Sequence, residues 1–542
     1  MYKYKHFKFS VSDPKVTDLT LISVEDERTG FVVRTALPNA GKQTASIMAF
    51  AGARFSRSDM SAHDIFKEIK DSGKNAQEKL ANIFNNYGHS SVGDMAQIFV
   101  YIENLPICYH IEFFYDTRIG GGQARSTRFQ NYKESYPVDF DLFIEDGKKY
   151  PELRKEYEEI YRKGIENYEK YYDRVCKAFE KYYKPGEGNK RHESALKARS
   201  LDTARVFIPL AASDSWAWIT SAREWARLIS VMKSDNRNFL QYLGEQLEAL
   251  LAPPEEVAKE LNYIAEAPDL IRHTEANHDI DESVYGVYEL VKDKIQVSDI
   301  DKSSQNFEQE VELLSNDFSA SEIALFQVLL TRHPNMTGME FKELLSLLSD
   351  EEKKEISKIL YKRFNHHSQL GRQAEGSSYS FRISASVSEL KDLNRHRAWA
   401  KFAPIWETDN VEEILNDGYV LPLYLNVPAF SDLREEFVND LNEYYAHLKE
   451  FYSKLPEGVN KRVALMLILQ SHRIDYYMHA SPKEVSFMTK LRIRPGGHIN
   501  YRMLAYMIAN EVAKSDPLLA GLGFAESEKP DPASREEFFD RS

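Results

Sequence analysis

A short segment rich in arginine and hydroxyl side chains is the first candidate for chemistry. Residues 118–132 read RIGGGQARSTRFQNY, so Arg118 is followed by seven residues and then by Ser126, with Arg128 two positions further on. A serine hydroxyl, two guanidinium groups and nearby backbone donors suit a phosphate or the polar edge of a pyrimidine. Spacing alone favours the plainer alternative of a solvated loop with surface arginines, and Gly120–Gly122 is typical of a flexible turn.

A second group of cations lies late in the chain. Arg395-His396-Arg397 forms one run, and Arg492 comes near the end of a helix that Ser481 is expected to begin. Guanidinium groups of this kind bind phosphates or stabilise charge that develops on a substrate. The alternatives are a solvated basic helix end for the run and a surface ion pair for Arg492.

The elements that would position these residues occur twice. Residues 151–183 and 432–454 each carry apolar side chains at helical spacing, which predicts two amphipathic helices with one buried face. They end at similar breaks, KPGEGNKR at 184–191 and LPEGVNKR at 455–462. Both halves therefore run from an amphipathic helix through a proline- and glycine-containing break to Asn-Lys-Arg.

The flanking segments repeat in the same order. Apolar residues alternate over 96–102 after GHSS at 88–91, and again over 379–385 after NHHS at 365–368, which predicts matching strands. Aromatic-rich strands at 216–219 and 476–478 precede capping boxes that begin at Ser221 and Ser481. The difference in residue number between matched positions falls from 277 at the GHSS and NHHS segments to 260 at the capping serines. Such a change is expected for a duplication with insertions and deletions.

Length and composition place these repeats in a soluble globular chain. With 542 residues, two domains are expected, here 1–290 and 291–542. The fold class is α/β (α+β), with a mixed or antiparallel sheet and long helices in each half, related by a pseudo-two-fold axis.

A net charge of −14 argues against binding of nucleic acid. No apolar run suggests a membrane span, and the first residues lack a signal core, so a cytoplasmic protein is expected. Two cysteines build no zinc cage, and no metal site is expected.

The ordered motifs resemble those of the flavin-dependent thymidylate synthases, whose signature is Arg-His-Arg, seven residues, then Ser. The likeness covers most of the first half and includes ARVFIPLAASDSWAWITSAREW at 204–225. There an Arg-x-x-x-Pro stretch leads to a helix start that reads Asn-Ala-Arg in the family. The matching residues are Arg205, Pro209, Ser221, Ala222 and Arg223, with serine in place of asparagine.

Each half departs from the family pattern in a different way. The first half has residues 116–118, Asp-Thr-Arg, where the family has Arg-His-Arg, and Met232 where the family carries a nucleotide-binding arginine. The second half keeps 395–397 as Arg-His-Arg and has Arg492 at that arginine's place. Its serine position is taken by Ile405.

These losses are complementary. Family members are homotetramers whose pockets are shared between subunits, so the resemblance implies one composite site built from both halves. The second half would supply Arg395, His396, Arg397 and Arg492. The first half would supply Ser126, Arg128 and Arg205, with Ser221 and Arg223 on the flavin side.

The resemblance also implies a reaction. FAD, NADPH and methylenetetrahydrofolate would convert dUMP to dTMP, with the cofactor carrying the difficult steps. Arg492 would be the catalytic residue, stabilising charge on the uracil ring. The nucleotide would be bound by Ser126, Arg128, Arg205, Arg395 and Arg492. FAD would be bound by Arg395, His396, Arg397, Ser221 and Arg223.

The sequence leaves two alternative functions open and predicts an oligomeric state. The chain is alternatively a related flavin enzyme that modifies another uracil nucleotide, because the glycines before Ser126 would change the pocket wall, or a catalytically inactive scaffold. A fused pair that replaces two subunits of a tetramer is expected to form a homodimer. Its partners would then be a small nucleotide and a folate, with neither nucleic acid nor membrane.

Overall fold

A computed structural model describes most of the chain. The described residues are 5–12, 19–38, 44–56, 58–72, 90–116, 120–125, 127, 132–144, 147–183, 190–235, 237–277, 308–315, 322, 325–326, 329, 338–360, 378–396, 398–403, 405, 410–494, 497–516 and 528–534. The expected domain boundary near 290 lies outside them and stays a prediction. Within these ranges no helix is long and apolar enough to cross a bilayer.

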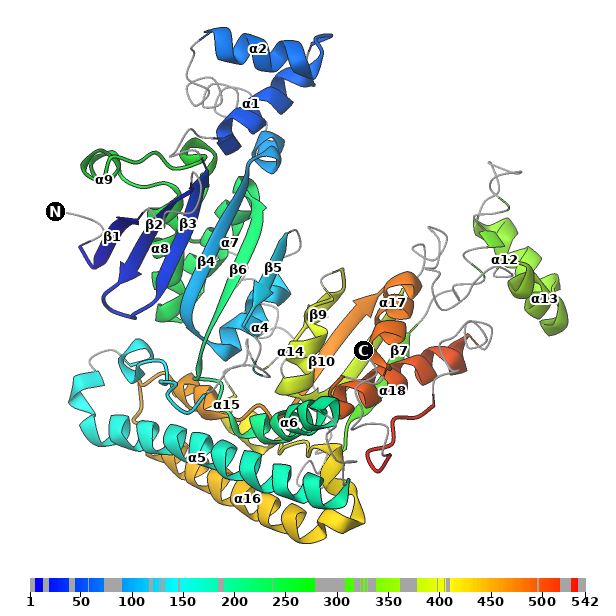
Figure 1. The fold of residues 1–542 in the computed structure, drawn as a ribbon. Helices are drawn as coiled ribbons and strands as arrows, with labels where there is room; N and C mark the ends of the chain where they lie inside the picture. The colour runs from blue at the N-terminus through cyan, green and yellow to red at the C-terminus, as the bar shows by residue number, and fades with distance from the viewer. Residues whose placement is uncertain are drawn as a thin grey trace.

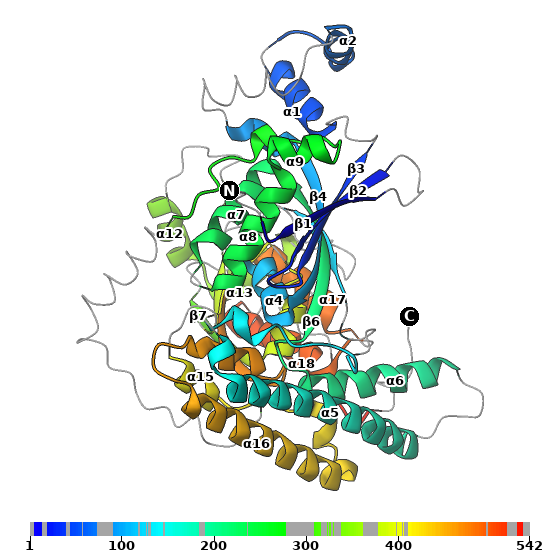
Figure 2. The same ribbon diagram turned by 90° about the vertical axis from the view of Figure 1, so that its left-hand side faces the viewer.

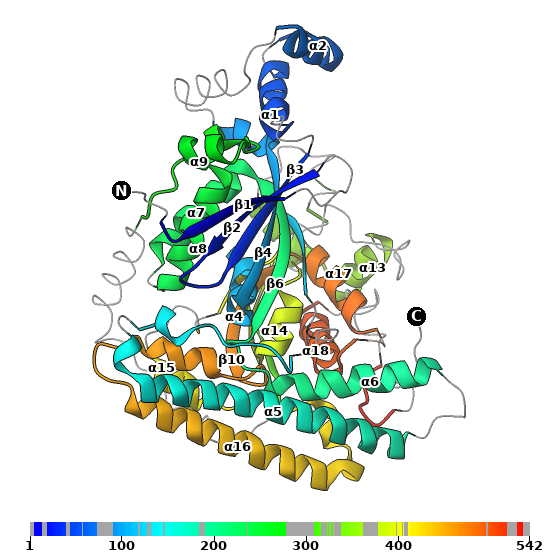
Figure 3. The same cartoon turned by 60° about the vertical axis from the view of Figure 1, so that its left-hand side comes forward.

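The first half contains a six-stranded sheet with the order β1-β2-β3-β4-β6-β5, in which every neighbouring pair is antiparallel. Its strands are β1 (Phe7–Ser12), β2 (Leu19–Asp26), β3 (Val32–Pro38), β4 (Gln97–Pro106), β5 (Gly121–Ala124) and β6 (Ser213–Ser221). Helices α7 (Ala222–Ser234) and α8 (Asn238–Leu251) cover one face of this sheet (Figure 3). The alternation over 96–102 is confirmed as β4, whose Ile98, Val100 and Ile102 point into the core.

The second half repeats the plan with four antiparallel strands in the order β7-β8-β10-β9. They are β7 (Glu310–Ser315), β8 (Tyr379–Ser386), β9 (Ala400–Phe402) and β10 (Arg473–Ala480), with α14 (Val387–Leu393), α17 (Pro482–Arg492) and α18 (Ile499–Ser515) beside them. The capping box at Ser481 is confirmed in full, because the serine accepts from the Glu484 amide and the Glu484 carboxylate accepts from Ser481. Ser221 caps α7 through the Glu224 amide, but the Glu224 carboxylate turns to Arg227 instead.

The two predicted long helices are confirmed as α5 (Pro151–Tyr182) and α16 (Ser431–Lys454). They lie side by side beneath both sheets (Figures 1 and 2) and run antiparallel, because Glu156 pairs with Lys454 while Arg174 pairs with Glu436. Each buries one face against the other half, so the two halves are held together along the full length of these helices.

A pseudo-two-fold axis passes between the halves near Pro209 and Leu469, which form an isolated β-bridge. The hydrogen bonds around the bridge are reciprocal. Leu210 N donates to Ile468 O at 2.9 Å and Gln470 N donates to Ile208 O at 3.1 Å. Each bond maps onto the other when residue numbers are shifted by 260, the offset of the two capping serines. Such self-complementary pairing is what a two-fold interface requires, and it supports the duplication.

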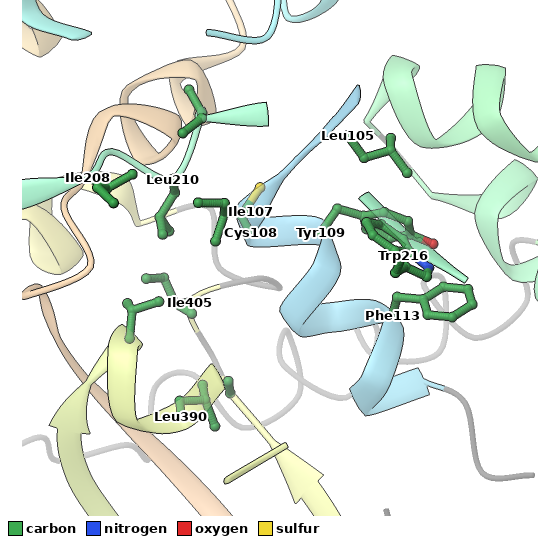
Figure 4. Close-up of a cluster of buried hydrophobic side chains, with 14 of the residues drawn as sticks. Leu105, Ile107, Cys108, Tyr109, Phe113, Ile208, Leu210, Trp216, Leu390 and Ile405 are labelled. Carbon is green, nitrogen blue, oxygen red and sulfur yellow. The ribbon is translucent and has the colours of Figure 1, made fainter. Parts of the chain in front are cut away.

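One hydrophobic core continues across this junction. Figure 4 shows Ile208 and Leu210 of the first half on one side, Leu390 and Ile405 of the second half on the other, and Cys108 near the centre. The Cys108 thiol lies 3.4 Å from Met466 Sδ. Because the core is shared, the halves bury apolar surface that neither would bury alone.

The remaining helices connect or extend this framework. Figure 1 shows that α1–α2 and α12–α13 extend away from the two sheets. The bounds are α1 (Thr44–Phe55), α2 (Ala62–Ser72), α4 (Ile107–Asp116), α6 (Lys190–Ala204), α9 (Glu255–Glu260), α12 (Gly338–Leu347), α13 (Asp350–Leu360) and α15 (Val411–Asn416). Of the paired GHSS and NHHS segments, only Ser90 and Ser91 are described, and they begin a 3-10 turn over Ser90–Met95.

The aromatic contact between α5 and α16 gives a test of the shared core. Phe437 is fully buried, with its ring 4.5 Å from that of Tyr171 and 4.6 Å from that of Phe207. Phe437→Ala should lower the free energy of unfolding by about 3–5 kcal/mol through lost burial and the cavity left behind. Chemical denaturation should show both halves unfolding together. Phe55→Ala, at a 57% exposed position, is the matched control and should change stability by no more than about 0.5 kcal/mol.

Candidate functional site

The centre of the candidate site is a buried ion pair between the two halves. Arg205 follows α6 in the first half and is only 1% exposed, and its Nη2 lies 3.0 Å from Asp392 Oδ2 on α14 of the second half. Burial opposes the charge of Arg205, but Asp392 and Asp202 outweigh it, so the Arg205 pKa is raised. Arg205 therefore stays charged and joins the two halves.

A hydroxyl from the arginine-rich segment completes this contact. Thr127 is buried, and its Oγ1 accepts from Arg205 Nη1 at 3.2 Å and from Lys391 Nζ at 2.9 Å. Burial, followed by the nearby charge of Arg205, lowers the Lys391 pKa to about 8. For Asp392, burial would raise the pKa, but Arg205 and Lys391 outweigh it and the pKa is lowered. The cluster is an acid held among buried cations.

Arg395 and Arg492 border the same cluster. Arg395 Nη2 lies 4.0 Å from Asp392 Oδ1, and its side chain is 49% exposed. Arg492 ends α17, and its Nε donates to His396 Nε2 at 2.9 Å. The Arg492 guanidinium also lies over the Tyr501 ring, 4.8 Å from the ring centroid. Cations from three separate elements therefore lie in the region of the buried Asp392 carboxylate, and such cations can bind an anionic ligand.

A second buried acid lies on the same helix. Glu389 accepts from the Ser386 amide in the capping box of α14, and its Oε1 is 3.9 Å from His498 Nδ1. Burial raises the Glu389 pKa to about 7, although Ser386 and Arg205 oppose the shift. Glu389 therefore binds a proton far more readily than an exposed glutamate does.

The structure brings together only part of the predicted site. It places Arg205, Arg395, His396 and Arg492 in one region, as the composite-site hypothesis expects. Ser126, Arg128 and Arg397 lie outside the described residues. Among described residues, no group of three or more histidine, cysteine or acidic side chains could hold a metal ion.

Ser221 and Arg223 lie elsewhere. Ser221 lies at the far end of β6 from Ser213, and at about 3.3 Å per residue this strand spans roughly 25 Å. Arg223 is 53% exposed and pairs with Asp94 at 3.0 Å. Within one chain, these two predicted flavin ligands therefore do not join the arginine cluster.

The glycine run has a packing role that its sequence does not reveal. Residues 121–124 form β5 beside β6, not the flexible turn that three glycines suggest. A Cβ added at Gly122 would lie 2.2 Å from the Trp218 ring, and one at Gly120, where φ is +145°, would lie 2.6 Å from the same indole. The glycines let β5 pass over Trp218.

Sequence reasoning missed four residues of the cluster: Thr127, Lys391, Asp392 and Tyr501. A signal existed for two of them. Lys391 and Asp392 come within four positions of Arg395, and Asp392 pairs with Arg395 three positions later, just beyond the end of α14. Thr127 and Tyr501 reach the cluster only through tertiary packing.

The equivalent region on the other side of the pseudo-two-fold axis is different. Met232 and Ile405, which replace the arginine and serine of the family pattern, are each 2% exposed and belong to the shared core. Glu112 on α4 pairs with Arg237 through two contacts of 2.6 and 2.7 Å, entirely within the first half. This buried pair thus lies within the first half, whereas the Arg205–Asp392 pair joins the two halves.

The part of the chain that the structure describes thus consists of two α/β halves with antiparallel sheets, joined by the buried Arg205–Asp392 pair. The family model described as "Thymidylate synthase complementing protein" matches residues 37–243 and 320–518. Since these segments span most of the chain, the protein belongs to this family, and the two matches agree with two copies of one domain.

Related proteins extend over the full duplicated length. A UPF0159 protein from Chlamydia pneumoniae is 20% identical over 472 residues, which cover 82% of this chain and 79% of that protein. A UPF0159 protein from Thermoplasma acidophilum is 21% identical over 513 residues, covering 87% of this chain and 93% of that one.

Two solved structures resemble a part of this chain. The UMP/dUMP methylase PolB from Streptomyces cacaoi with 5-Br dUMP has a TM-score of 0.30 and 16% identity, covering 41% of this chain and 98% of its own. The flavin-dependent thymidylate synthase ThyX from Helicobacter pylori with FAD and dUMP has a TM-score of 0.24 and 17% identity. The match covers 41% of this chain and 96% of that one.

The raised Glu389 pKa predicts a pH dependence of stability. A carboxyl whose pKa is higher in the folded state contributes most below its unfolded pKa of about 4.3, and this contribution is lost as pH rises toward 7. Relative to Glu389→Gln, the parent should lose up to about 1.4 kcal/mol per pH unit over that interval and level off above it. Denaturant unfolding at pH 5, 6, 7 and 8 measures the difference. Glu484→Gln, in the part-exposed capping box of α17, is the control and should parallel the parent; a parallel profile for Glu389→Gln would contradict the prediction.

Proposed function

We propose that this chain is a cytoplasmic flavin-dependent thymidylate synthase that methylates dUMP to dTMP, with methylenetetrahydrofolate, FAD and NADPH, at one composite site between its halves. The observation that carries this proposal is the contact between complementary residue sets. Arg205 of the first half meets Asp392 of the second, beside Arg395 and Arg492. Membership of the thymidylate synthase complementing protein family supports the same reaction class.

The cluster fits the anionic part of a nucleotide. Arg205, Lys391 and Arg395 lie around Asp392, with the buried carboxyl groups of Asp202 and Glu389 also near Arg205. A phosphate would meet several cationic donors here. Arg395 is half-exposed and its ion pair is long, which leaves it accessible to an incoming anion. Ser126 and Arg128 flank Thr127 in the chain, and we assign them to the same nucleotide from the first half.

Arg492 fits the reacting end of the nucleotide. Its Nε is engaged by His396, which leaves the two terminal Nη groups out of that hydrogen bond. A guanidinium edge held in this way can donate to a uracil carbonyl and stabilise negative charge that develops on the ring. No side chain of the cluster is needed as a nucleophile, because FAD supplies the redox chemistry when bound.

The flavin requires residues from two regions. Arg395 and Arg397 would hold its phosphates on the second half, while Ser221 and Arg223 lie at the N-terminal end of α7, where backbone N–H groups favour anions. The length of β6 separates these regions within one chain. A second copy would bring Ser221 and Arg223 of one chain to the Arg395 side of the other.

The assembly state follows from this separation. The purified protein should be a homodimer, with twice the chain mass of 62.7 kDa. Light scattering at micromolar concentration measures this directly, and a monomer that binds FAD stoichiometrically would contradict it. Arg223→Ala should reduce the flavin content and leave dUMP affinity unchanged, because Arg223 lies far from the nucleotide cluster of its own chain.

Substitution of Arg492 tests the catalytic assignment. Arg492→Ala should leave the fold and the bound flavin intact and reduce dUMP affinity or turnover by roughly ten- to a hundred-fold, the loss expected for one charge-assisted contact of about 1.5–3 kcal/mol. Flavin absorbance and dUMP titration on the same sample give both readouts. Arg494→Ala, at an exposed position two residues after Arg492, is the control. Parent-like turnover of dUMP by Arg492→Ala would refute the role. A parent that prefers UMP would identify another uracil nucleotide as substrate, and a colourless parent that binds no nucleotide would identify a scaffold.

A further inference from the structure

We propose that His396 is a positioning residue for Arg492: a neutral imidazole that accepts a hydrogen bond from the guanidinium and fixes its orientation toward the nucleotide. This inference rests on the proposed function and changes the role that the family resemblance implies for His396, which is flavin binding.

The hydrogen bond fixes the state of the imidazole. Arg492 Nε can only donate, so His396 Nε2, 2.9 Å away, must be the acceptor. The proton of the ring therefore sits on Nδ1, and the ring is neutral. A protonated imidazolium has no acceptor and would repel the guanidinium, so the arrangement exists in one protonation state only.

The surroundings hold the ring in that state. His396 is 9% exposed, it stacks on Trp399 with ring centroids 5.4 Å apart, and the Phe487 ring meets it edge-on at 6.2 Å. Lys401 Nζ donates to the His396 backbone carbonyl at 2.6 Å. The charged groups that face the ring, from α17, from β9 and from its own turn, are Arg492, Lys401 and Arg395, and all are cations. Burial and these charges lower the His396 pKa to about 3.

Arg492 is thereby held at two points. Its Nε is bonded to His396, and the Tyr501 ring lies against its flat face at 4.8 Å. A free arginine side chain loses rotamer entropy when it is ordered, and here that loss precedes the binding of substrate. The edge that carries Nη1 and Nη2 is then presented in one direction, as an electrostatic catalyst requires.

The experiment compares two substitutions of His396. His396→Gln keeps a carbonyl acceptor at similar reach, whereas His396→Leu fills the space without one. His396→Leu should lose roughly ten- to a hundred-fold in kcat for dUMP with unchanged flavin content, and His396→Gln should recover most of it. In an Arg492→Ala background, His396→Leu should cause no further loss, because the two residues act as one unit. Thermal unfolding confirms that each variant is folded.

Different outcomes separate this inference from the proposed function. Loss of flavin from His396→Leu with normal kcat per bound flavin, or additive losses in the double variant, would overturn the positioning role. Side-chain ¹⁵N NMR gives a readout independent of turnover. The parent should show a neutral Nδ1–H imidazole from pH 5 to 9, and the Nε2 signal should shift in Arg492→Ala. A parent that gives this signature yet does not turn over dUMP would refute the thymidylate synthase proposal and leave the His396–Arg492 contact established, whereas a titrating imidazole would refute the inference itself.

Discussion

The ion pair between Arg205 and Asp392 is the contact on which the site depends. Both groups are almost entirely buried, and a buried charge without a partner costs several kcal/mol, so neither residue can be changed alone without a large loss. The reciprocal backbone bonds explain why the pair forms. They bring the carbonyls of Val206 and Ile208 against Ser471 and Gln470, which delivers Arg205, the preceding residue, to the second half. The candidate site is therefore a property of the fused chain and not of either half.

Duplication leaves a symmetric backbone with asymmetric side chains. On one side of the axis the junction buries Lys391, Asp392 and Arg205, and on the other it buries Met232 and Ile405 with a local Glu112–Arg237 pair. Burying a polar cluster costs free energy unless each of its groups has a hydrogen-bonding or charged partner. Apolar side chains stabilise a junction without that requirement. Once two copies are fused, one pocket can serve as core while the other keeps the chemistry. Under the proposed function, this division would account for the different departures of the two halves from the family motif.

Local patterns were enough to predict much of the fold. The periodicity of 151–183 and 432–454 gave both long helices within about a residue, and the capping boxes located the starts of α7 and α17. These features depend on neighbours three or four positions apart, which a sequence displays directly. The strand β5 was missed because its glycines are explained only by Trp218, nearly a hundred residues later. Thr127 was passed over for the same reason, since its two partners lie in other elements. Arg205, Arg395 and Arg492 were found by resemblance to a family, and their convergence could not be derived from spacing.

The electrostatics of the site also differ from those of the whole chain. A net charge of −14 says nothing of a junction at which Arg205, Lys391 and Arg395 lie around Asp392, with Arg492 bonded to the neighbouring His396. Long-range repulsion of an anionic substrate by the acidic surface is screened beyond about 10 Å, while buried cations act at contact distance in a low dielectric. Burial is the main cause of the lowered pKa values of Lys391 and His396, and the nearby arginines lower both further. Under the proposed function, the phosphate of the nucleotide would supply negative charge that offsets these cations.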